Sequence, residues 1–254
     1  MRGLPGKRVF VTGGASGIGR AIALRLGAEG CAVTVLDIDG PGAVAVAKQI
    51  QCSSRALACT ADVSNIEAVV RAVDASEAEL GPIDVLVNNA GWDRPTRFVE
   101  SSPEFWRKVI DINLLGPLNV THTVARRMVA RGGGKIINIA SDAGRVGSSG
   151  EVVYSACKGG VIAFSKSLAR ELSRDNVLVN TICPGPTDTP LLDAFAAEST
   201  GGAKILEGLK RAIPLRRLGV PEDYPGLVAF FASEDANFIQ GQTISVSGGL
   251  SMHG

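Results

Sequence analysis

The chain has 254 residues, 45% of them hydrophobic, and its 26 Lys and Arg residues balance 25 Asp and Glu residues. This hydrophobic fraction is ample for a globular core, and the even charge balance argues against a nucleic-acid-binding or anionic-membrane surface. The five cysteines contain no C-x-x-C pair and there are only two histidines, so the sequence offers no metal-ligand spacing and no metal site is predicted.

The first residues, "MRGLPGKRVFVTGG", reach a strand-like run without the longer apolar segment of a signal peptide. No later stretch has the length of an uncharged membrane span. The odd number of cysteines fits reduced thiols. We therefore expect a cytoplasmic protein without membrane or nucleic-acid partners.

Seven short runs rich in β-branched residues recur along the chain. They are "RVFVTG" (8–13), "CAVTVLD" (31–37), "RALACTADV" (55–63), "DVLVNNAG" (84–91), "KIINIAS" (135–141), "VLVNTICPG" (177–185) and "QTISVSGG" (242–249). Most are apolar at successive positions, which is typical of strands covered on both faces by helices. The sequence predicts a seven-stranded, mostly parallel sheet.

The segments between these runs, such as residues 17–30 and 161–176, carry apolar residues at helical spacing and end at Gly or Asn. No linker or repeat interrupts the alternation, so residues 1–254 are predicted to form one doubly wound, Rossmann-like α/β domain with helices on both faces. Residues 187–219 are too long for a simple crossover, and this insertion is expected to be a substrate lid.

The first predicted strand runs into "TGGASGIG", in which Gly13, Gly17 and Gly19 precede a helix. A turn without Cβ atoms lets a pyrophosphate approach the backbone and rest on the helix N-terminus. The Gly-Lys-Ser/Thr ending of a nucleoside triphosphate loop is absent. A structural glycine turn is the alternative, but the position at the first strand-to-helix junction favours a dinucleotide.

Asp37 closes the second predicted strand, where a carboxylate can accept hydrogen bonds from the adenosine ribose hydroxyls. Its charge would repel a 2′-phosphate, and no basic residue stands between Gly13 and Gly19 to offset it, which favours NAD over NADP. The alternative makes Asp37 a helix N-cap. Asp62, at the end of the third strand, can meet the adenine or cap the helix expected from Ser64.

Tyr154 and Lys158 are spaced i,i+4 on a predicted helix, and Ser141 ends a predicted strand. A free tyrosine has a pKa of roughly 10, but a nearby ammonium and a positively charged nicotinamide ring would both favour the phenolate. Tyr154 could then take the proton of an alcohol. The alternatives are a solvated surface pair for Tyr154 and Lys158, a strand-end cap for Ser141 and a helix-interior amide for Asn113.

Over nearly its whole length the chain resembles the short-chain dehydrogenase/reductase family. The resemblance rests on "TGGASGIG" (12–19), "NNAG" (88–91), Asn113 in "INLLG", Ser141, "YSACK" (154–158) and "PGPTDT" (184–189), in family order.

The resemblance implies that Asn113, Ser141, Tyr154 and Lys158 form the catalytic set. In this assignment Ser141 binds the substrate oxygen, Lys158 also holds the nicotinamide ribose and Asn113 fixes a water that passes the proton to solvent. The implied cofactor-binding residues are Gly13, Ser16, Gly17, Ile18, Gly19, Asp37, Asp62, Val63, Asn89, Ala90, Gly91, Tyr154, Lys158, Pro184, Gly185, Thr187 and Thr189.

Four stretches resemble, more narrowly, family members that oxidise a ring hydroxyl β to a CoA thioester with NAD: "NNAGWD" (88–93), "ASDAGRVGSSGEVVYSACKGG" (140–160), "CPGPTDT" (183–189) and "SVSGGLSM" (245–252). They contain Asp93 and the candidate substrate residues Trp92, Arg145, Gly147 and Glu151. We therefore expect oxidation of 2-hydroxycyclohexanecarboxyl-CoA or a similar cyclic β-hydroxyacyl-CoA to the 2-oxo thioester. Basic residues of the lid could meet CoA phosphates or form a solvated face.

Two other functions stay open at this point: a carbonyl reductase for bulky or aryl ketones or 3-oxoacyl thioesters, and a non-catalytic dinucleotide-binding sensor. By the same family resemblance we expect a homotetramer, with "LVAFFAS" and the C-terminal strand at the interfaces. Core packing is the alternative explanation for the two phenylalanines of that segment.

Overall fold

The computed structural model describes residues 1–189, 192 and 202–252. Seven strands form one sheet: β1 (Arg8–Thr12), β2 (Ala32–Asp37), β3 (Ala56–Thr60), β4 (Val85–Asn88), β5 (Gly134–Ile139), β6 (Val177–Pro184) and β7 (Thr243–Val246). The strand order is β3-β2-β1-β4-β5-β6-β7, and all six strand pairings are parallel. The prediction of a single doubly wound domain is confirmed, and the sheet proves to be parallel throughout.

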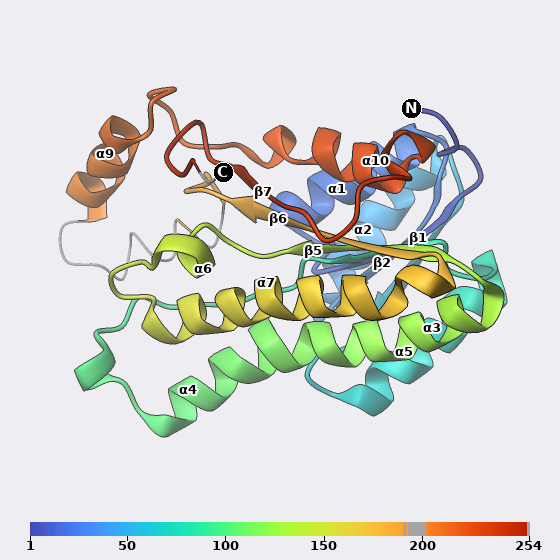
Figure 1. Ribbon diagram of the computed structural model, residues 1–254, viewed down its shortest axis with the longest axis horizontal. Helices are drawn as coiled ribbons and strands as arrows, with labels where there is room; N and C mark the ends of the chain where they lie inside the picture. The colour runs from blue at the N-terminus through green and yellow to red at the C-terminus, as the bar shows by residue number, and fades with distance from the viewer. Residues whose placement is uncertain (190–191, 193–201, 253–254) are drawn as a thin grey trace.

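Helices cover both faces of the sheet (Figure 1). On one face lie α1 (Gly17–Ala28), α2 (Gly40–Gln51) and α10 (Pro225–Ala232), and on the other lie α3 (Ile66–Leu80), α5 (Gly116–Arg131) and α7 (Val152–Leu172). Shorter elements lie near one end of the sheet: α4 (Pro103–Ile110), a π-helical turn (Asp111–Leu115), α6 (Ala143–Val146) and α9 (Gly202–Ala212).

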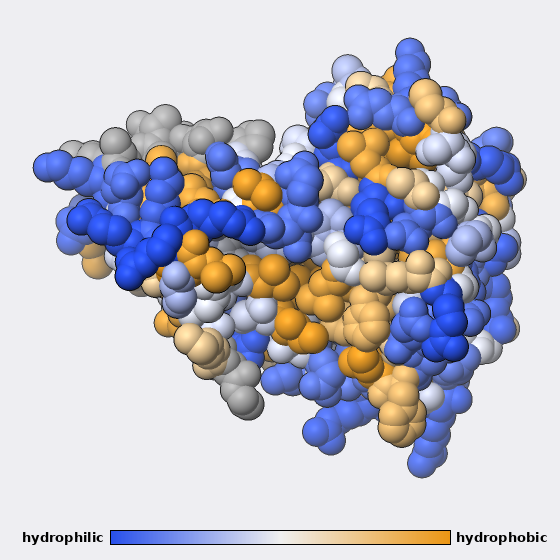
Figure 2. Space-filling model, turned by 90° about the horizontal axis from the view of Figure 1, so that it is seen from above, coloured by the Kyte–Doolittle hydropathy of each residue, from blue (hydrophilic) through white to orange (hydrophobic). Residues whose placement is uncertain are grey.

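The face that carries α10 and the C-terminal segment shows apolar side chains gathered in a band between hydrophilic regions (Figure 2). Phe230 and Leu227 of α10 are half-buried there, whereas Phe238, beyond the helix, is fully exposed. No described helix is long and apolar enough to cross a membrane.

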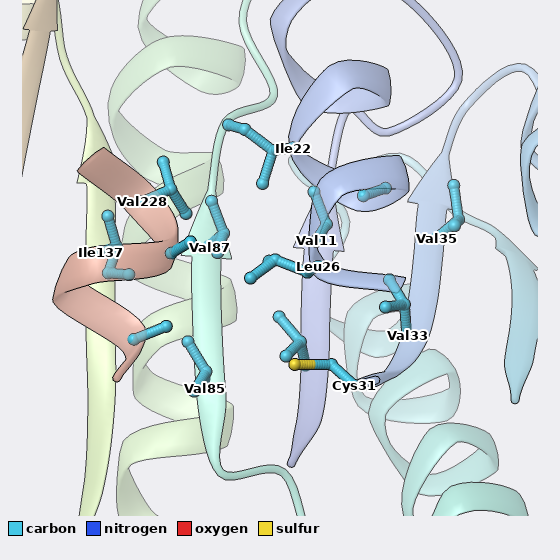
Figure 3. Packing of buried hydrophobic residues seen from close by; sticks show 14 of the residues in the cluster. Val11, Ile22, Leu26, Cys31, Val33, Val35, Val85, Val87, Ile137 and Val228 are labelled. Carbon is cyan, nitrogen blue, oxygen red and sulfur yellow. The ribbon is translucent and has the colours of Figure 1, made fainter. Parts of the chain in front are cut away.

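Two hydrophobic clusters sandwich the sheet because successive residues of each strand point to opposite faces. Val9 and Val11 pack towards α1 and α10, and the intervening Phe10 packs towards α3 and α5. Figure 3 shows the first cluster, with Ile22 and Leu26 of α1 lying over the central strands. Because both faces of the sheet are buried, the strand sequences are apolar at successive positions.

The strand order reverses between β1 and β4, which are neighbours in the sheet although β2, β3 and their helices separate them in sequence. In an open parallel sheet the loops leaving two such strands diverge to opposite faces and open a crevice. The glycine turn after β1 and the loop after β4 therefore frame one site.

Candidate active site

The turn after β1 has a backbone that only glycine fits. Gly13 and Gly17 have φ angles of +64° and +50°. A Cβ on Gly19 would lie 2.0 Å from the Gly13 carbonyl oxygen and 2.4 Å from Asn89 Nδ2. Because Gly13 has no side chain, the turn packs closely against the loop after β4, where a Cβ on Gly13 would lie 2.7 Å from Ala90 Cα.

The N-terminus of α1 faces this turn. Its N-cap residue, Ser16, is exposed and makes no side-chain capping hydrogen bond, whereas the neighbouring Ile18 packs against the core. The first backbone N–H groups of a helix have no partner within the helix. This end of α1 therefore fits a pyrophosphate group.

Asp37 is the last residue of β2, and its carboxylate accepts hydrogen bonds from the N–H groups of Ala15 (2.9 Å) and Asp39 (3.0 Å). The N-cap of α2 is Asp39, whose side chain accepts from Gly42 N. The alternative of Asp37 as the helix N-cap is therefore wrong. Asp37 instead holds the glycine turn with its carboxylate at the edge of the crevice.

Asp62 follows β3 and accepts hydrogen bonds from both the N–H and the hydroxyl of Ser64 (2.9 and 2.8 Å). Helix α3 begins at Ile66 and is capped by Asn65, so Asp62 stabilises the preceding turn rather than the helix. Val63 is buried beside this turn.

The loop after β4 is tied to β1. The N–H groups of Asn89 and Ala90 donate to Thr12 Oγ1 (3.0 and 3.1 Å), and Asn89 Nδ2 donates to the Gly13 carbonyl (3.0 Å). A Cβ on Gly91 would lie 3.0 Å from Asn113 Oδ1 and 3.5 Å from Lys158 Nζ. The loop therefore passes directly beside two predicted catalytic residues.

Lys158 is 3% exposed, and its ammonium donates to the Ile139 carbonyl at the end of β5 (3.1 Å). Nζ lies 5.4 Å from the centroid of the Tyr154 ring, one turn earlier on α7. Burial lowers the pKa of Lys158 to about 8. A solvated surface pair is excluded, because the ammonium is enclosed.

Ser141, which follows β5, accepts a hydrogen bond from Ala143 N (3.1 Å), and its hydroxyl lies near enough to the Tyr154 phenol to lower the pKa of Tyr154. Burial, with further contributions from Glu151 and Asp93, raises the pKa of Tyr154, and the Ser141 hydroxyl opposes this rise. Burial and the nearby carboxyl groups thus favour the phenol over the phenolate.

Asn113 is fully buried in the π-helical turn. Its amide donates to the carbonyls of Trp92 (2.6 Å) and Val109 (2.9 Å), and its Oδ1 accepts from Trp92 N (3.2 Å). One amide hydrogen bond holds the loop after Gly91 through Trp92, and the other binds the carbonyl of Val109 in α4. A proton-relaying water on Asn113 must therefore bind elsewhere than to its amide hydrogens.

The segment after β6 lies on the other side of the glycine turn. A Cβ on Gly17 would lie 3.6 Å from Thr189 Cγ2, and Thr187 Oγ1 donates to the Gly185 carbonyl (2.8 Å). Thr187 also hydrogen-bonds the buried hydroxyl of Tyr224. Pro184, the last residue of β6, is buried.

Of the predicted lid, 190–191 and 193–201 lie outside the described residues. The described part of this insertion contains α9, and Arg217 beyond it forms a bidentate ion pair with Asp223 (2.6 and 2.8 Å).

The four candidate substrate residues differ in placement. Trp92 lies under Lys108, whose Nζ is 3.8 Å from a Trp92 ring centroid, and Glu151 lines a small pocket near Tyr154. Arg145 donates to Ser245 Oγ (3.0 Å) and the Thr243 carbonyl (3.3 Å), so its guanidinium is bound to β7. Gly147 is exposed with a φ angle of +79°.

Asp93 is not among the candidate substrate residues predicted from the sequence. This residue is 9% exposed, and its Oδ2 has no hydrogen-bond partner among the residues that the structure describes. Burial is the main cause that raises its pKa to about 7. An acidic residue directly after "NNAGW" was the available signal, but only the fold shows that it is buried beside the site.

Fold and site together define a dinucleotide-binding α/β protein with a Ser/Tyr/Lys cluster. The family model for short chain dehydrogenases matches residues 7–199. An acetoacetyl-CoA reductase of Shinella zoogloeoides is 41% identical over 94% of this chain and 96% of its own length, and a (3R)-3-hydroxyacyl-CoA dehydrogenase of Rattus norvegicus is 38% identical over 96% and 95%. The chain belongs to the short-chain dehydrogenase family.

A solved structure of 3-ketoacyl-(acyl-carrier-protein) reductase from Brucella melitensis, complexed with NADH, superposes with a TM-score of 0.89 at 31% identity. The alignment covers 98% of this chain and all of that one.

Backbone contact between α6 and α7 sets the position of Ser141 relative to Tyr154. A Cβ on Gly144 would lie 2.6 Å from both Lys158 C and Gly159 N, so we expect Gly144→Ala to destabilise the fold by about 1–3 kcal/mol and to lower turnover. Urea unfolding and initial rates measure the two effects. Gly208→Ala, at an exposed position of α9 with no described atom within 4 Å, is the control and should not destabilise. Wild-type stability and turnover of Gly144→Ala would contradict the assignment.

Proposed function

We propose that this protein is an NAD(H)-dependent oxidoreductase that interconverts a β-hydroxyacyl thioester and the corresponding β-oxoacyl thioester. The observation that carries the proposal is the cluster of Ser141, Tyr154 and Lys158 beside a glycine turn that fits a dinucleotide. A protein that only senses a dinucleotide has no need for a phenol placed beside Ser141 and Lys158.

Tyr154 acts as the acid in ketone reduction and as the base in alcohol oxidation. During reduction its phenol donates a proton to the substrate oxygen while hydride reaches the carbonyl carbon, and during oxidation both transfers reverse. Ser141 donates a hydrogen bond to the same oxygen and stabilises the charge that develops on it. The dinucleotide supplies the hydride acceptor or donor and, when oxidised, a positive charge that favours the phenolate.

Lys158 has a positioning and electrostatic role in this mechanism. One donor of its ammonium is held by the Ile139 carbonyl, which leaves the others for the nicotinamide ribose hydroxyls. Its location beside Tyr154 adds a cation that opposes the carboxyl groups of Asp93 and Glu151. Asn113 holds the loop between these residues and the cofactor cradle.

The carboxylate of Asp37 supports NAD as the cofactor. It stands at the end of β2, where the adenosine ribose of a dinucleotide bound to the glycine turn would lie, and its negative charge disfavours a 2′-phosphate. The NADH complex of the Brucella reductase is consistent with this choice.

Relatives named for acetoacetyl-CoA, 3-hydroxyacyl-CoA and 3-oxoacyl-acyl-carrier-protein support a thioester substrate. Within that class, we propose 2-hydroxycyclohexanecarboxyl-CoA or a similar cyclic substrate, as the narrower sequence resemblance predicts. Open-chain 3-oxoacyl thioesters are the second candidate, and the names of the relatives favour them directly.

A panel of initial rates tests the substrate class. We expect NADH formation from cyclic and open-chain β-hydroxyacyl-CoA substrates to exceed, in kcat/KM, that from the free hydroxy acids and from a simple aryl alcohol. The ratio of kcat/KM for the cyclic thioester to kcat/KM for the open-chain thioester decides between these two candidate substrates. If the enzyme oxidises only alcohols that carry no CoA group, the thioester assignment is wrong. If the protein binds the cofactor but turns over no substrate, the function of a non-catalytic dinucleotide sensor is supported.

Replacing the proposed acid/base group should abolish most of the turnover. Tyr154→Phe is expected to lower kcat by roughly 10²–10⁴-fold because no other group then exchanges the substrate proton. NADH fluorescence should show that cofactor binding persists. Tyr224→Phe, at the only other tyrosine of the chain, is the control and should lose far less, because Tyr224 is buried against Thr187. A nearly active Tyr154→Phe enzyme would remove the mechanism.

Asp37→Asn should shift cofactor preference towards NADP. Removing one like charge near the 2′-phosphate is expected to raise the NADP-to-NAD ratio of kcat/KM by roughly tenfold, equivalent to about 1.4 kcal/mol. Asp39→Asn is the matched control, since an Asn at that position can still cap α2. An unchanged ratio in Asp37→Asn would contradict the assigned ribose contact.

We also propose a homotetramer as the working assembly. The apolar band on the α10 face and the exposed side chains of Ile244 on β7 and Met252 beyond it support self-association. Light scattering at working concentration should give four times the chain mass of 26.3 kDa, and a monomer would exclude the assembly.

A further inference from the structure

A small pocket adjoins the catalytic cluster. The loop after β4 and the start of α4 form one wall, and the residues that lead into α7 form the other. Its lining includes the aromatic rings of Phe98 and Phe105 and the carboxyl-bearing residues Asp93 and Glu151. Because Tyr154 lies one turn beyond Glu151, a substrate bound to Tyr154 has this pocket next to it.

Asp93 is the unusual group in this pocket. Its side chain is more than nine-tenths buried, yet Oδ2 has no hydrogen-bond partner among the described residues. The backbone N–H of Arg94 lies near enough to the Asp93 carboxyl group to lower the pKa of Asp93. A buried polar atom without a partner destabilises the fold, so its retention in a pocket beside the site indicates a partner supplied by a ligand.

The surroundings of Asp93 favour its neutral form. Burial and the charge of Glu151 raise its pKa to about 7, and Lys158 opposes this rise. Tyr154 and Cys157 also lie within electrostatic reach of Asp93. Burial also raises the pKa of Glu151, and the Ser148 side chain opposes this rise. Near neutral pH, Asp93 can thus offer an O–H to a ligand.

We propose that Asp93, as a carboxylic acid, donates a hydrogen bond to the thioester carbonyl oxygen of the substrate and thereby determines specificity. The inference rests on the proposed function. A β-oxoacyl thioester carries a second carbonyl two carbons from the reacting one, whereas a simple ketone does not. Ser141 and Tyr154 hold the first oxygen, so a donor in the adjoining pocket distinguishes the two substrate classes.

The test compares pH profiles of kcat/KM for reduction of acetoacetyl-CoA and of a simple aryl ketone. This parameter reports ionisations of the free enzyme. With the wild-type enzyme, kcat/KM for acetoacetyl-CoA should fall as pH rises through about 7, because Asp93 loses its donor proton. The aryl ketone should show no fall in that range.

Three variants test whether Asp93 causes the fall in kcat/KM near pH 7. Asp93→Asn keeps a neutral donor, so its acetoacetyl-CoA profile should lose the fall near pH 7 while activity at pH 6 is retained. Asp93→Leu removes the donor and should lower kcat/KM for acetoacetyl-CoA roughly tenfold or more at pH 6, the effect of one lost hydrogen bond. Glu100→Gln removes an exposed carboxylate of the same region, at 58% side-chain exposure, and should leave the profile unchanged.

The outcomes separate this inference from the proposed function. If acetoacetyl-CoA is reduced but the Asp93 variants change both substrates equally, Asp93 acts only through the charge near Tyr154 and the inference fails. If neither acetoacetyl-CoA nor a cyclic β-oxoacyl-CoA is reduced by the wild-type enzyme while the aryl ketone is, the proposed function fails first.

Thermal unfolding gives a readout independent of activity. An aspartic acid whose folded-state pKa is raised binds its proton more tightly when folded, so its contribution to stability is complete below pH 4 and is lost as pH rises through about 7. The Tm advantage of Asp93→Asn over wild type should therefore grow between pH 5 and pH 8. A constant difference over this range would show that Asp93 is already ionised at pH 5 and would overturn the inference.

Discussion

The hydrogen bonds from Asn89 and Ala90 to Thr12 Oγ1 join the ends of β1 and β4, where the strand order reverses. They bring the loop after β4 so close to the glycine turn that a Cβ on Gly13 would overlap the Ala90 backbone and a Cβ on Gly19 would overlap the Asn89 side chain. Gly91, in the same loop, then passes beside Asn113 and Lys158. One junction therefore positions both the dinucleotide cradle and the chemical groups.

Burial dominates the electrostatics of the site. It lowers the pKa of Lys158 and raises those of Tyr154, Asp93 and Glu151, so the protein groups alone favour neutral forms. An enclosed site of this kind responds strongly to a charge that arrives with a ligand, because water does not screen it. A cation that arrived beside Tyr154 would therefore lower the pKa of its phenol.

Much of the site could be predicted from local sequence. The i,i+4 spacing of Tyr154 and Lys158 and the strand-end position of Ser141 depend on chain-local geometry, and the structure brings these residues together as predicted. Hydrogen bonding proved less predictable: the Asn113 amide holds the backbone of Trp92, and Arg145 binds to β7. Each of these two hydrogen-bonding arrangements depends on a partner from a distant segment of the chain, which a local sequence pattern does not predict.

The sequence by itself determined the seven apolar strands, their covering helices and the glycine turn, because side-chain periodicity and the absence of Cβ atoms are properties of the local chain. Only the tertiary structure decided which of several carboxylates is accessible and which is enclosed. Asp37 is half-buried at the edge of the crevice, whereas Asp93 is buried and its Oδ2 has no hydrogen-bond partner in the described part of the chain. Desolvation depends on every element packed around a group, so the ionisation of Asp93 follows from the fold and not from its neighbours in sequence.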